Sequence, residues 1–149
     1  MSAARGFTVI ELLIALVVLA LLGAAVAPAW HEQVVRTRRH EAQATMERLM
    51  LQQERYYTQN GSYLAFSARS TDPEQRQFQW WSGASAQTSS HEIEGRACDG
   101  QRLSECLQLL ATPGTAMVDA GFRDRGCEQL ILTSTGLRLA RGPQSQCWR

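Results

Sequence analysis

The sequence predicts an α+β fold in which a long N-terminal α-helix, membrane-spanning in its first half, packs on an antiparallel β-sheet head. Three observations lead to this prediction. An apolar run extends from Phe7 to Trp30 and contains Glu11 as its only charge. A helical repeat of apolar residues then continues to Tyr57, and the rest of the chain holds only short strand-like segments. With 149 residues, the chain has room for one membrane segment and one small domain.

The composition argues against catalysis and against a strongly charged binding surface. The formal net charge is +1, whereas nucleic-acid binders commonly carry a large positive excess. The three histidines, His31, His40 and His91, are isolated in the sequence. No nucleophile, carboxylate pair or glycine-rich phosphate loop accompanies them there, so we expect no enzymatic activity and no cofactor.

The apolar run is long enough to cross a membrane. Residues 1–6 form a short polar leader, which we exclude from the fold as a processing segment. A helix over 7–30 would reach about 36 Å, more than the hydrocarbon core of about 30 Å. Gly23 and Pro28 are weak points of this helix, because Pro removes a backbone donor and clashes with the preceding turn. Glu11 is notable because an unpaired carboxylate in hydrocarbon is costly.

The helix should continue beyond the apolar run as an amphipathic segment over 31–57. Apolar residues recur there at steps of three and four, which gives one mainly apolar face. This face comprises Val35, Ala42, Met46, Leu49, Met50, Gln53 and Tyr57. The opposite positions carry the charged residues Arg38, Glu41, Glu47, Arg48 and Glu54. Asn60-Gly61 is a strong stop signal, so the helix should end close to it.

The head, residues 58–149, should consist of a loop followed by short strands. Residues 62–76 indicate the loop, since they include several Ser, Thr, Asp and Pro residues. Strand candidates follow at 78–81, 91–94, 107–112, 129–133 and 137–139. The last two flank Ser134-Thr135-Gly136 and therefore predict a β-hairpin. Because the connections are short, we expect a mostly antiparallel sheet against the second half of the helix.

Four cysteines, Cys98, Cys106, Cys127 and Cys147, all lie in the second half of the chain. An even count behind a membrane-targeting N-terminus indicates two disulfides formed in an oxidising compartment. No C-x-x-C pair is present, so a metal site is not favoured. Four cysteines allow three connectivities, and the residues alone leave the choice open.

The N-terminal motif resembles that of the type IV pilin family. Residues Gly6 to Glu11 read Gly-Phe-Thr-Val-Ile-Glu and match the family's leader pattern G-F-T-[LV]-[IV]-E at every position. Two further stretches, 55–63 and 127–148, resemble the PilE-type minor pilins, a subfamily that includes the ComP-like DNA-uptake pilins. The likeness covers the first third and the last fifth of the chain, whereas 64–97 has no counterpart that we can align.

The resemblance implies a processing and assembly route. A prepilin peptidase would cleave after Gly6, and the new N-terminus at Phe7 would be methylated and remain positively charged. The carboxylate of Glu11 would pair with that amine on a neighbouring subunit, because charges attract strongly where water is excluded. Other pilin subunits and the inner-membrane assembly platform would be the partners. The protein would span the inner membrane once, with its head in the periplasm, and later become part of an extracellular pilus.

The resemblance also bears on the cysteines. The preferred pairing is Cys98 with Cys106 and Cys127 with Cys147, of which the second matches the disulfide-bounded C-terminal region of the resembled family. Closing a loop of about twenty residues stabilises a small domain by about 3 kcal/mol in the chain-entropy model.

A nucleic-acid surface is the alternative that the head leaves open. Aromatic residues that could stack on bases are Trp80, Trp81 and Trp148, and cations that could contact phosphates include Arg96, Arg102, Arg123, Arg125, Arg138 and Arg141. The residues singled out as contacts are Arg123, Arg125, Arg138, Arg141 and Trp148. From Arg96 to Arg149, seven Arg face five acids, a net charge of +2 that is typical of an ordinary mixed surface.

We therefore expect a minor pilin-like structural subunit of a type IV pilus that takes part in pilus assembly, adhesion or twitching motility. The alternatives are a pilus-borne DNA receptor for natural transformation and a pseudopilin of type II secretion. The head decides between them, because the leader motif is common to all three.

Overall fold

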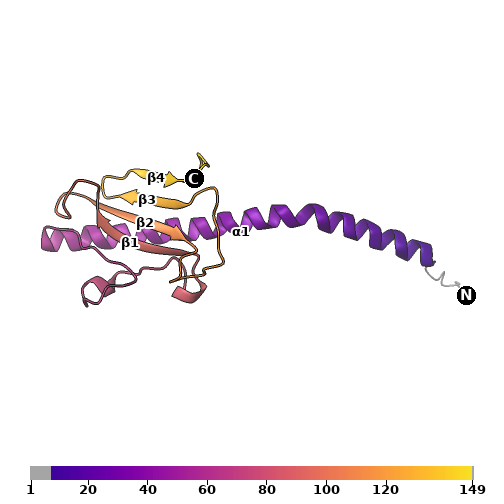
Figure 1. Ribbon diagram of the computed structural model, residues 1–149, viewed down its shortest axis with the longest axis horizontal. Helices are drawn as coiled ribbons and strands as arrows, with labels where there is room; N and C mark the ends of the chain where they lie inside the picture. The colour runs from indigo at the N-terminus through magenta and orange to yellow at the C-terminus, as the bar shows by residue number, and fades with distance from the viewer. Residues whose placement is uncertain (1–7, 149) are drawn as a thin grey trace, which may run out of the picture. The chain divides into compact units, whose positions relative to one another are not determined.

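The computed structural model describes residues 8–148, apart from the side chains of 24–29 (Figure 1). Gly6 and Phe7, at the expected cleavage and methylation site, lie outside the described residues. The chain forms two compact units, residues 1–36 and residues 37–149, and we describe each by itself. The α-helix α1, Val9–Asn60, contributes to both units.

The first unit contains the beginning of α1, which starts with a capping pattern. The backbone N–H of Glu11 donates to the Thr8 carbonyl at 3.1 Å and lies 3.4 Å from the Thr8 hydroxyl. Thr followed three residues later by Glu is the sequence pattern of a capping box, so these two residues also help to start the helix. The helix continues through Gly23 and Pro28 without a break. Among the described residues no helix meets the length and hydropathy required of a membrane span.

The second unit holds the rest of α1, and its buried face agrees with the helical repeat of the sequence. Ala42, Met46, Leu49 and Gln53 are fully buried. The amide of Gln53 is satisfied there, because it donates to the Leu64 carbonyl at 2.7 Å and accepts from the Leu64 N–H at 3.0 Å. A polar side chain can thus occupy the core face of a helix at little cost.

Four strands form one antiparallel sheet in the order β1-β2-β3-β4. The strands are β1 His91–Ala97, β2 Leu107–Pro113, β3 Gln129–Thr133 and β4 Arg138–Arg141. The expected hairpin joins β3 to β4, and Gly136 supplies the positive φ of 85° that its turn requires. The sheet lies against α1 (Figure 1), and the long helix packed on an antiparallel sheet is the fold predicted from the sequence.

The expected strand over 78–81 is not formed. This segment makes one isolated bridge to β1, between Trp81 and Glu92, and follows the short 3₁₀ helix Gln75–Gln77. The side chain of Gln79 donates to the carbonyls of Trp81 and Gly83, at 2.7 and 3.1 Å. These local bonds satisfy backbone acceptors that a strand would pair with a neighbour, so the segment turns away after one bridge.

The core lies between the sheet and α1, and alternation along the strands decides which residues enter it. Leu107, Leu109 and Ala111 of β2 share this face with Leu130 and Leu132 of β3, and all are buried. On β1, a Cβ at Gly95 would lie 2.5 Å from the ring of Phe66, which explains why a residue without a side chain stands there. The backbones of Phe66 and Gly95 also exchange two hydrogen bonds, each N–H donating to the other residue's carbonyl. Two disulfides flank the sheet, Cys98–Cys106 and Cys127–Cys147.

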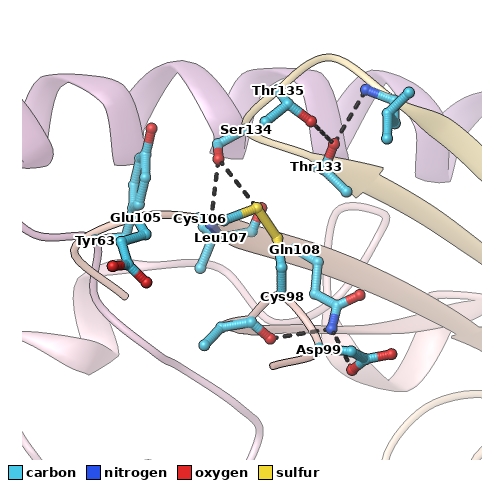
Figure 2. Close-up of a disulfide and its surroundings, with 12 residues drawn as sticks. Tyr63, Cys98, Asp99, Glu105, Cys106, Leu107, Gln108, Thr133, Ser134 and Thr135 are labelled. Atoms are coloured by element: carbon cyan, nitrogen blue, oxygen red, sulfur yellow. Dashed lines mark hydrogen bonds between the residues drawn. A yellow bond between two sulfur atoms is a disulfide. The ribbon is translucent and has the colours of Figure 1, made fainter. Parts of the chain in front are cut away.

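The first disulfide closes the connection between β1 and β2 (Figure 2). Around it, the amide of Gln108 donates to the Ala97 carbonyl at 3.0 Å and to Asp99 at 3.1 Å. The hydroxyl of Ser134 accepts the Leu107 N–H at 3.2 Å. The Gln108 bonds hold the start of β2 to the end of β1 and the loop that follows it, and the Ser134 bond holds it to the turn of the β3–β4 hairpin. Both disulfides have the pairing preferred from the sequence.

Candidate nucleic-acid interface

The segment after β4, residues 142–148, folds back along the strand and carries the second disulfide, which ties Cys147 to Cys127. The indole N–H of Trp148 donates to the Leu139 carbonyl of β4 at 2.6 Å, and this bond fixes the ring beside the strand. Gly142 has φ 125°, and a Cβ there would lie 2.6 Å from the Gly126 carbonyl oxygen, so the chain can turn closely only with glycine at this position.

An open groove of about 420 Å³ lies between β4 and this C-terminal segment. Its lining contains one cation, one aromatic ring and several small or polar residues, namely Arg138, Ala140, Gly142, Pro143, Gln144, Ser145, Cys147 and Trp148. We call it the C-terminal groove. It combines the two types of side chain that contact nucleic acids most readily, a guanidinium for phosphates and an aromatic ring for stacking.

Arg138 and Trp148 form a pair at the C-terminal groove. The guanidinium carbon of Arg138 lies 5.8 Å from the centroid of the Trp148 ring, within cation–π range. Nη2 of Arg138 lies 2.7 Å from Oε1 of Glu47, a residue of α1. The guanidinium is therefore held in place from two sides and is still half-exposed.

The other sequence-selected arginines lie elsewhere. Arg138 pairs across the sheet with Leu132, so its side chain shares the helix-facing side, whereas Arg141 is three positions further along β4 and lies on the opposite side. Arg123 and Arg125 belong to the connection between β2 and β3. Of the five selected residues, the structure therefore brings together Arg138 and Trp148. The other three, Arg123, Arg125 and Arg141, lie at other places on the head.

The guanidinium groups of Arg123 and Arg125 differ in how many contacts they make within the protein. Nη1 of Arg123 donates to the carbonyls of Ala120 and Phe122, both at 2.7 Å, so it stabilises its own loop. Arg125 is exposed, and no ion pair involves it within residues 8–148. Of the two, Arg125 is the one whose guanidinium is available to a ligand.

The remaining aromatic and basic candidates are largely occupied by structural contacts. Trp80 packs against the core, and Trp80 and Trp81 meet edge to face at 5.1 Å. Arg96 pairs with Asp99 at 3.7 Å, and Arg102 pairs with Glu105 at 2.9 Å. The latter pairing lowers the pKa of the Glu105 carboxyl, chiefly through the hydrogen bonds that Arg102 donates.

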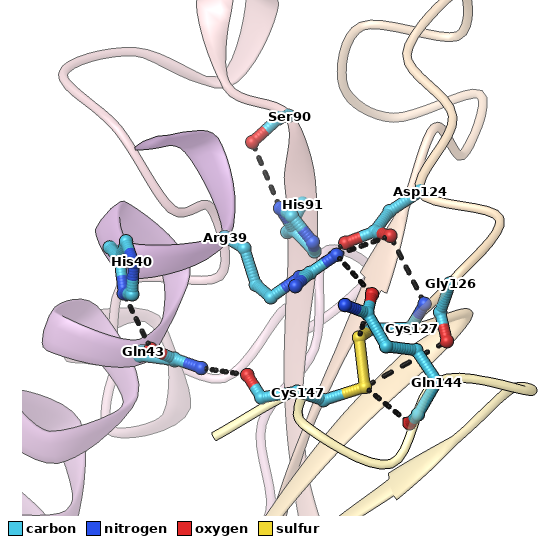
Figure 3. A network of polar contacts seen from close by, with 10 residues as sticks. All are labelled: Arg39, His40, Gln43, Ser90, His91, Asp124, Gly126, Cys127, Gln144 and Cys147. Carbon is cyan, nitrogen blue, oxygen red and sulfur yellow. Dashed lines mark hydrogen bonds and ion pairs between the residues drawn. A yellow bond between two sulfur atoms is a disulfide. The ribbon is translucent and has the colours of Figure 1, made fainter. Parts of the chain in front are cut away.

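A buried polar network anchors the C-terminal segment to α1 (Figure 3). Arg39 donates two bonds to the Asp124 carboxylate, at 2.7 and 2.8 Å, and both side chains are buried. Arg39 also donates to Gln144 at 3.3 Å, and Gln43 donates to the Cys147 carbonyl at 2.5 Å. Asp124 accepts the N–H of Cys127, so both ends of the second disulfide are tied to this network.

Sequence reasoning missed this network. Arg39 precedes Ala42 by three positions and Met46 by seven. Those offsets place Arg39 on the buried face of the helix. A buried Arg needs an acidic partner, and the helical periodicity does not indicate that Asp124, 85 positions later, supplies it.

His91 lies beside this network in the buried interior (Figure 3). Its Nδ1 is 2.9 Å from the Ser90 hydroxyl, and its ring is 5.4 Å from that of Phe122. Burial lowers the pKa of His91 from 6.5 to about 4, while Asp124 acts in the opposite direction and Arg39 adds to the lowering. His91 is therefore neutral at physiological pH. Within the described residues, no cluster of three or more His, Cys, Asp or Glu could hold a metal ion.

A long helix packed on a four-stranded antiparallel sheet, with a disulfide-bounded C-terminal region, defines the class of type IV pilins. Two family models match the chain. The family described as the type IV minor pilin ComP, DNA uptake sequence receptor, matches residues 28–131, and the prokaryotic N-terminal methylation motif matches residues 1–27. The chain therefore belongs to the type IV minor pilin family of ComP, whose members are structural subunits and not enzymes.

Comparison with solved structures finds other pilins. A type IV pilin from Shewanella oneidensis is 21% identical, with a TM-score of 0.47, and the match covers 77% of this chain and 98% of that one. The non-core minor pilin PilV of Neisseria meningitidis is 19% identical, with a TM-score of 0.48, and the match covers 77% and 94%. None of the curated proteins compared with the chain matches it. The methylation motif implies insertion in the inner membrane, followed by incorporation in a pilus with the pilus machinery as partner.

Proposed function

We propose that this minor pilin is a DNA receptor of a type IV pilus and that it binds duplex DNA at the C-terminal groove. The observation that carries the proposal is the match of residues 28–131 to the family described as the DNA uptake sequence receptor. The groove itself lies beyond the matched range, at 138–148, so its assignment rests on its own chemistry.

The charge of the segment around the groove supports this assignment. Residues 138–149 contain Arg138, Arg141 and Arg149 and no acidic residue, whereas the whole chain has a net charge of only +1. Local excess of cations, and not net charge, determines whether a surface attracts a polyanion. The groove lining has one cation, Arg138, and no acidic residue, so it offers a contact point for a phosphate of the duplex backbone.

The two paired side chains have different roles in the proposed complex. Arg138 donates to a backbone phosphate, because its guanidinium fork matches the geometry of phosphate oxygens. Trp148 contributes a flat apolar surface for sugar or base atoms, while its indole N–H stays bonded to the Leu139 carbonyl. The buried Arg39–Asp124 pair and the second disulfide keep the segment in place, so little order has to be gained on binding.

The direct test is binding of a fluorescent duplex of about 30 base pairs to the full chain in a mild detergent, followed by anisotropy at about 50 and 200 mM salt. Detergent is needed because apolar side chains between Val9 and Leu22 are exposed. Arg138→Gln should weaken binding and reduce the salt dependence by about one counterion. Arg76→Gln removes an exposed charge from the loop region before β1 and serves as the matched control.

Two results bear against the proposal. If the wild-type chain shows no salt-sensitive DNA binding at micromolar concentration, it is not a DNA receptor, and the role of a structural minor pilin in assembly, adhesion or motility remains. If it binds DNA and Arg138→Gln binds equally well, the DNA site lies away from the C-terminal groove.

The same proposal includes the route by which the receptor reaches the pilus. The leader, residues 1–6, is removed after Gly6, and Phe7 is methylated, as the match of residues 1–27 to the methylation motif supports. Residues 7–30 form the half of the helix that lies in the membrane and later in the fibre core, with Gly23 and Pro28 as its weak points. Residues 31–57 are the amphipathic half of the helix, and 58–149 are the head.

Glu11 is proposed to pair with the methylated amine of a neighbouring subunit during assembly. Glu11→Ala should leave membrane insertion unchanged and reduce the amount of this subunit in sheared pili. Incorporation of Glu11→Ala at the wild-type level would show that the carboxylate has no role in assembly.

A further inference from the structure

Glu47 forms an ion pair with the cation of the C-terminal groove. Its Oε1 lies 2.7 Å from Nη2 of Arg138, although the two residues are 91 positions apart in the chain. Both side chains remain in contact with water, since Glu47 is 49% exposed and Arg138 is 55% exposed. Exposed pairs of this kind are weak, because water screens the charges and both long side chains lose conformational freedom.

A weak, half-exposed pair can exchange its anion. The guanidinium of Arg138 has five N–H donors, and the contact with Glu47 uses one of its nitrogens. A phosphate oxygen can accept from the same fork, and it can do so with two parallel bonds. Glu47 is already half-hydrated, so its release into water requires little change elsewhere in α1.

We propose that Glu47 is an internal competitor for the phosphate site of Arg138, and that DNA binding exchanges Glu47 for a backbone phosphate. This inference rests on the proposed function and adds a residue that regulates it. In the free protein, Glu47 cancels the charge of Arg138 and keeps the guanidinium beside Trp148. In the complex, the phosphate takes the place of the carboxylate, and Glu47 turns into solvent.

The exchange determines which anions the groove accepts. Replacing one carboxylate by one phosphate leaves the charge of the site nearly balanced, so a single small anion gains little. A DNA strand presents many phosphates along its length, so its binding to the groove releases several counterions in one event, whereas a single small anion releases at most one. The competitor therefore favours a polyanion over free phosphate or a lone carboxylate.

The test is Glu47→Gln in the full chain, measured with the same labelled duplex and salt series. Glutamine keeps the shape of the side chain and removes its charge. We expect about threefold to tenfold tighter binding, because one anion no longer repels or competes with the phosphate. The slope of the logarithm of the binding constant against the logarithm of salt concentration should steepen by up to about one.

Glu41→Gln is the matched control. Glu41 lies on the same helix and pairs with Arg38 at 3.4 Å, so the substitution removes an equal charge from another exposed pair. We expect its DNA affinity to stay within about twofold of wild type, since Glu41 pairs with Arg38 and not with the cation of the C-terminal groove, and salt weakens its longer-range effect. In the double variant Glu47→Gln/Arg138→Gln the gain should disappear, because the released cation is gone.

Each outcome decides the proposal. Tighter binding by Glu47→Gln that depends on Arg138 supports the exchange. Wild-type affinity in Glu47→Gln, or an equal gain in Glu41→Gln, overturns the exchange and leaves the DNA-receptor function standing. Absence of DNA binding by the wild-type chain overturns both. Glu47→Ala repeats the measurement if the glutamine variant is less stable in thermal unfolding.

Discussion

His91 should make the head lose stability as the pH falls below neutral. The imidazole is buried at the start of β1 and touches the ring of Phe122 and the hydroxyl of Ser90. Burial lowers its pKa from 6.5 to about 4, with the Asp124 charge opposing the shift and the Arg39 charge adding to it. A proton can therefore be gained at His91 in mild acid only when the head unfolds.

Proton linkage gives the sign and size of the change in the free energy of unfolding with pH. The unfolded chain binds a proton at His91 near pH 6.5, whereas the folded head does so only near pH 4. Between these values the unfolded state holds more protons, so the free energy of unfolding decreases as the pH decreases. One pKa unit is worth about 1.4 kcal/mol, which gives about 3 kcal/mol in full, of which about 2 kcal/mol is lost between about pH 7.5 and pH 5.

The assay is urea unfolding of the full chain in detergent at these two pH values, followed by tryptophan fluorescence. The His91→Gln variant should be less stable than wild type at neutral pH, because it alters a packed site. Its loss of stability on acidification should nevertheless be about 2 kcal/mol smaller than that of wild type. His31→Gln removes an exposed histidine and controls for the loss of an imidazole as such.

The comparison between variants, and not the absolute stability, decides the outcome. Carboxylates elsewhere also titrate in acid, and their contribution is common to wild type and His91→Gln. If both proteins lose the same stability between about pH 7.5 and pH 5, His91 is not held neutral by burial and the reasoning is refuted.

Three further perturbations test the interior of the head by denaturant or thermal unfolding. Asp124→Asn leaves Arg39 buried without a counter-ion and should lower the free energy of unfolding by about 3–5 kcal/mol. The control Asp99→Asn, at an exposed ion pair, should lower it by less than about 1 kcal/mol. Equal effects of the two variants would mean that burial of the Arg39–Asp124 pair is irrelevant. Gly95→Ala places a methyl group 2.5 Å from the ring of Phe66 and should cost about 1–3 kcal/mol, and an unchanged midpoint would show that the ring can move aside. Replacing both Cys127 and Cys147 by serine opens a loop with a sequence separation of 20 and should lower the free energy of unfolding by about 3 kcal/mol. DNA affinity should also fall, because this disulfide holds the segment that lines the C-terminal groove.

Local patterns in the sequence were sufficient for most of the fold. The helical repeat that includes Ala42, Met46 and Leu49 placed the buried face of α1, because residues three and four apart lie on one side of a helix. Asn60-Gly61 marked the end of the helix, where Gly61 has the positive φ of 71° that closes it. The strands predicted at 107–112 and 129–133 form as β2 and β3, and the predicted hairpin follows them.

The segment 78–81 shows where local pattern fails. Its aromatic residues favour a strand, but Phe78 enters the core against Phe66, and Gln79 bonds the carbonyls that a strand would pair. Strand propensity expresses how well a side chain fits a half-buried surface, and tertiary contacts decide whether the surface is there.

The sequence by itself determined that this chain is a pilin, since a leader motif, one long helix and short strands are all read from neighbouring residues. Only the tertiary structure decided which charges matter in the head. It buried Arg39 with Asp124 and placed Arg138 beside Trp148 and Glu47. The physical reason is that charge pairing depends on contacts between residues as far as 91 positions apart, which no local periodicity records.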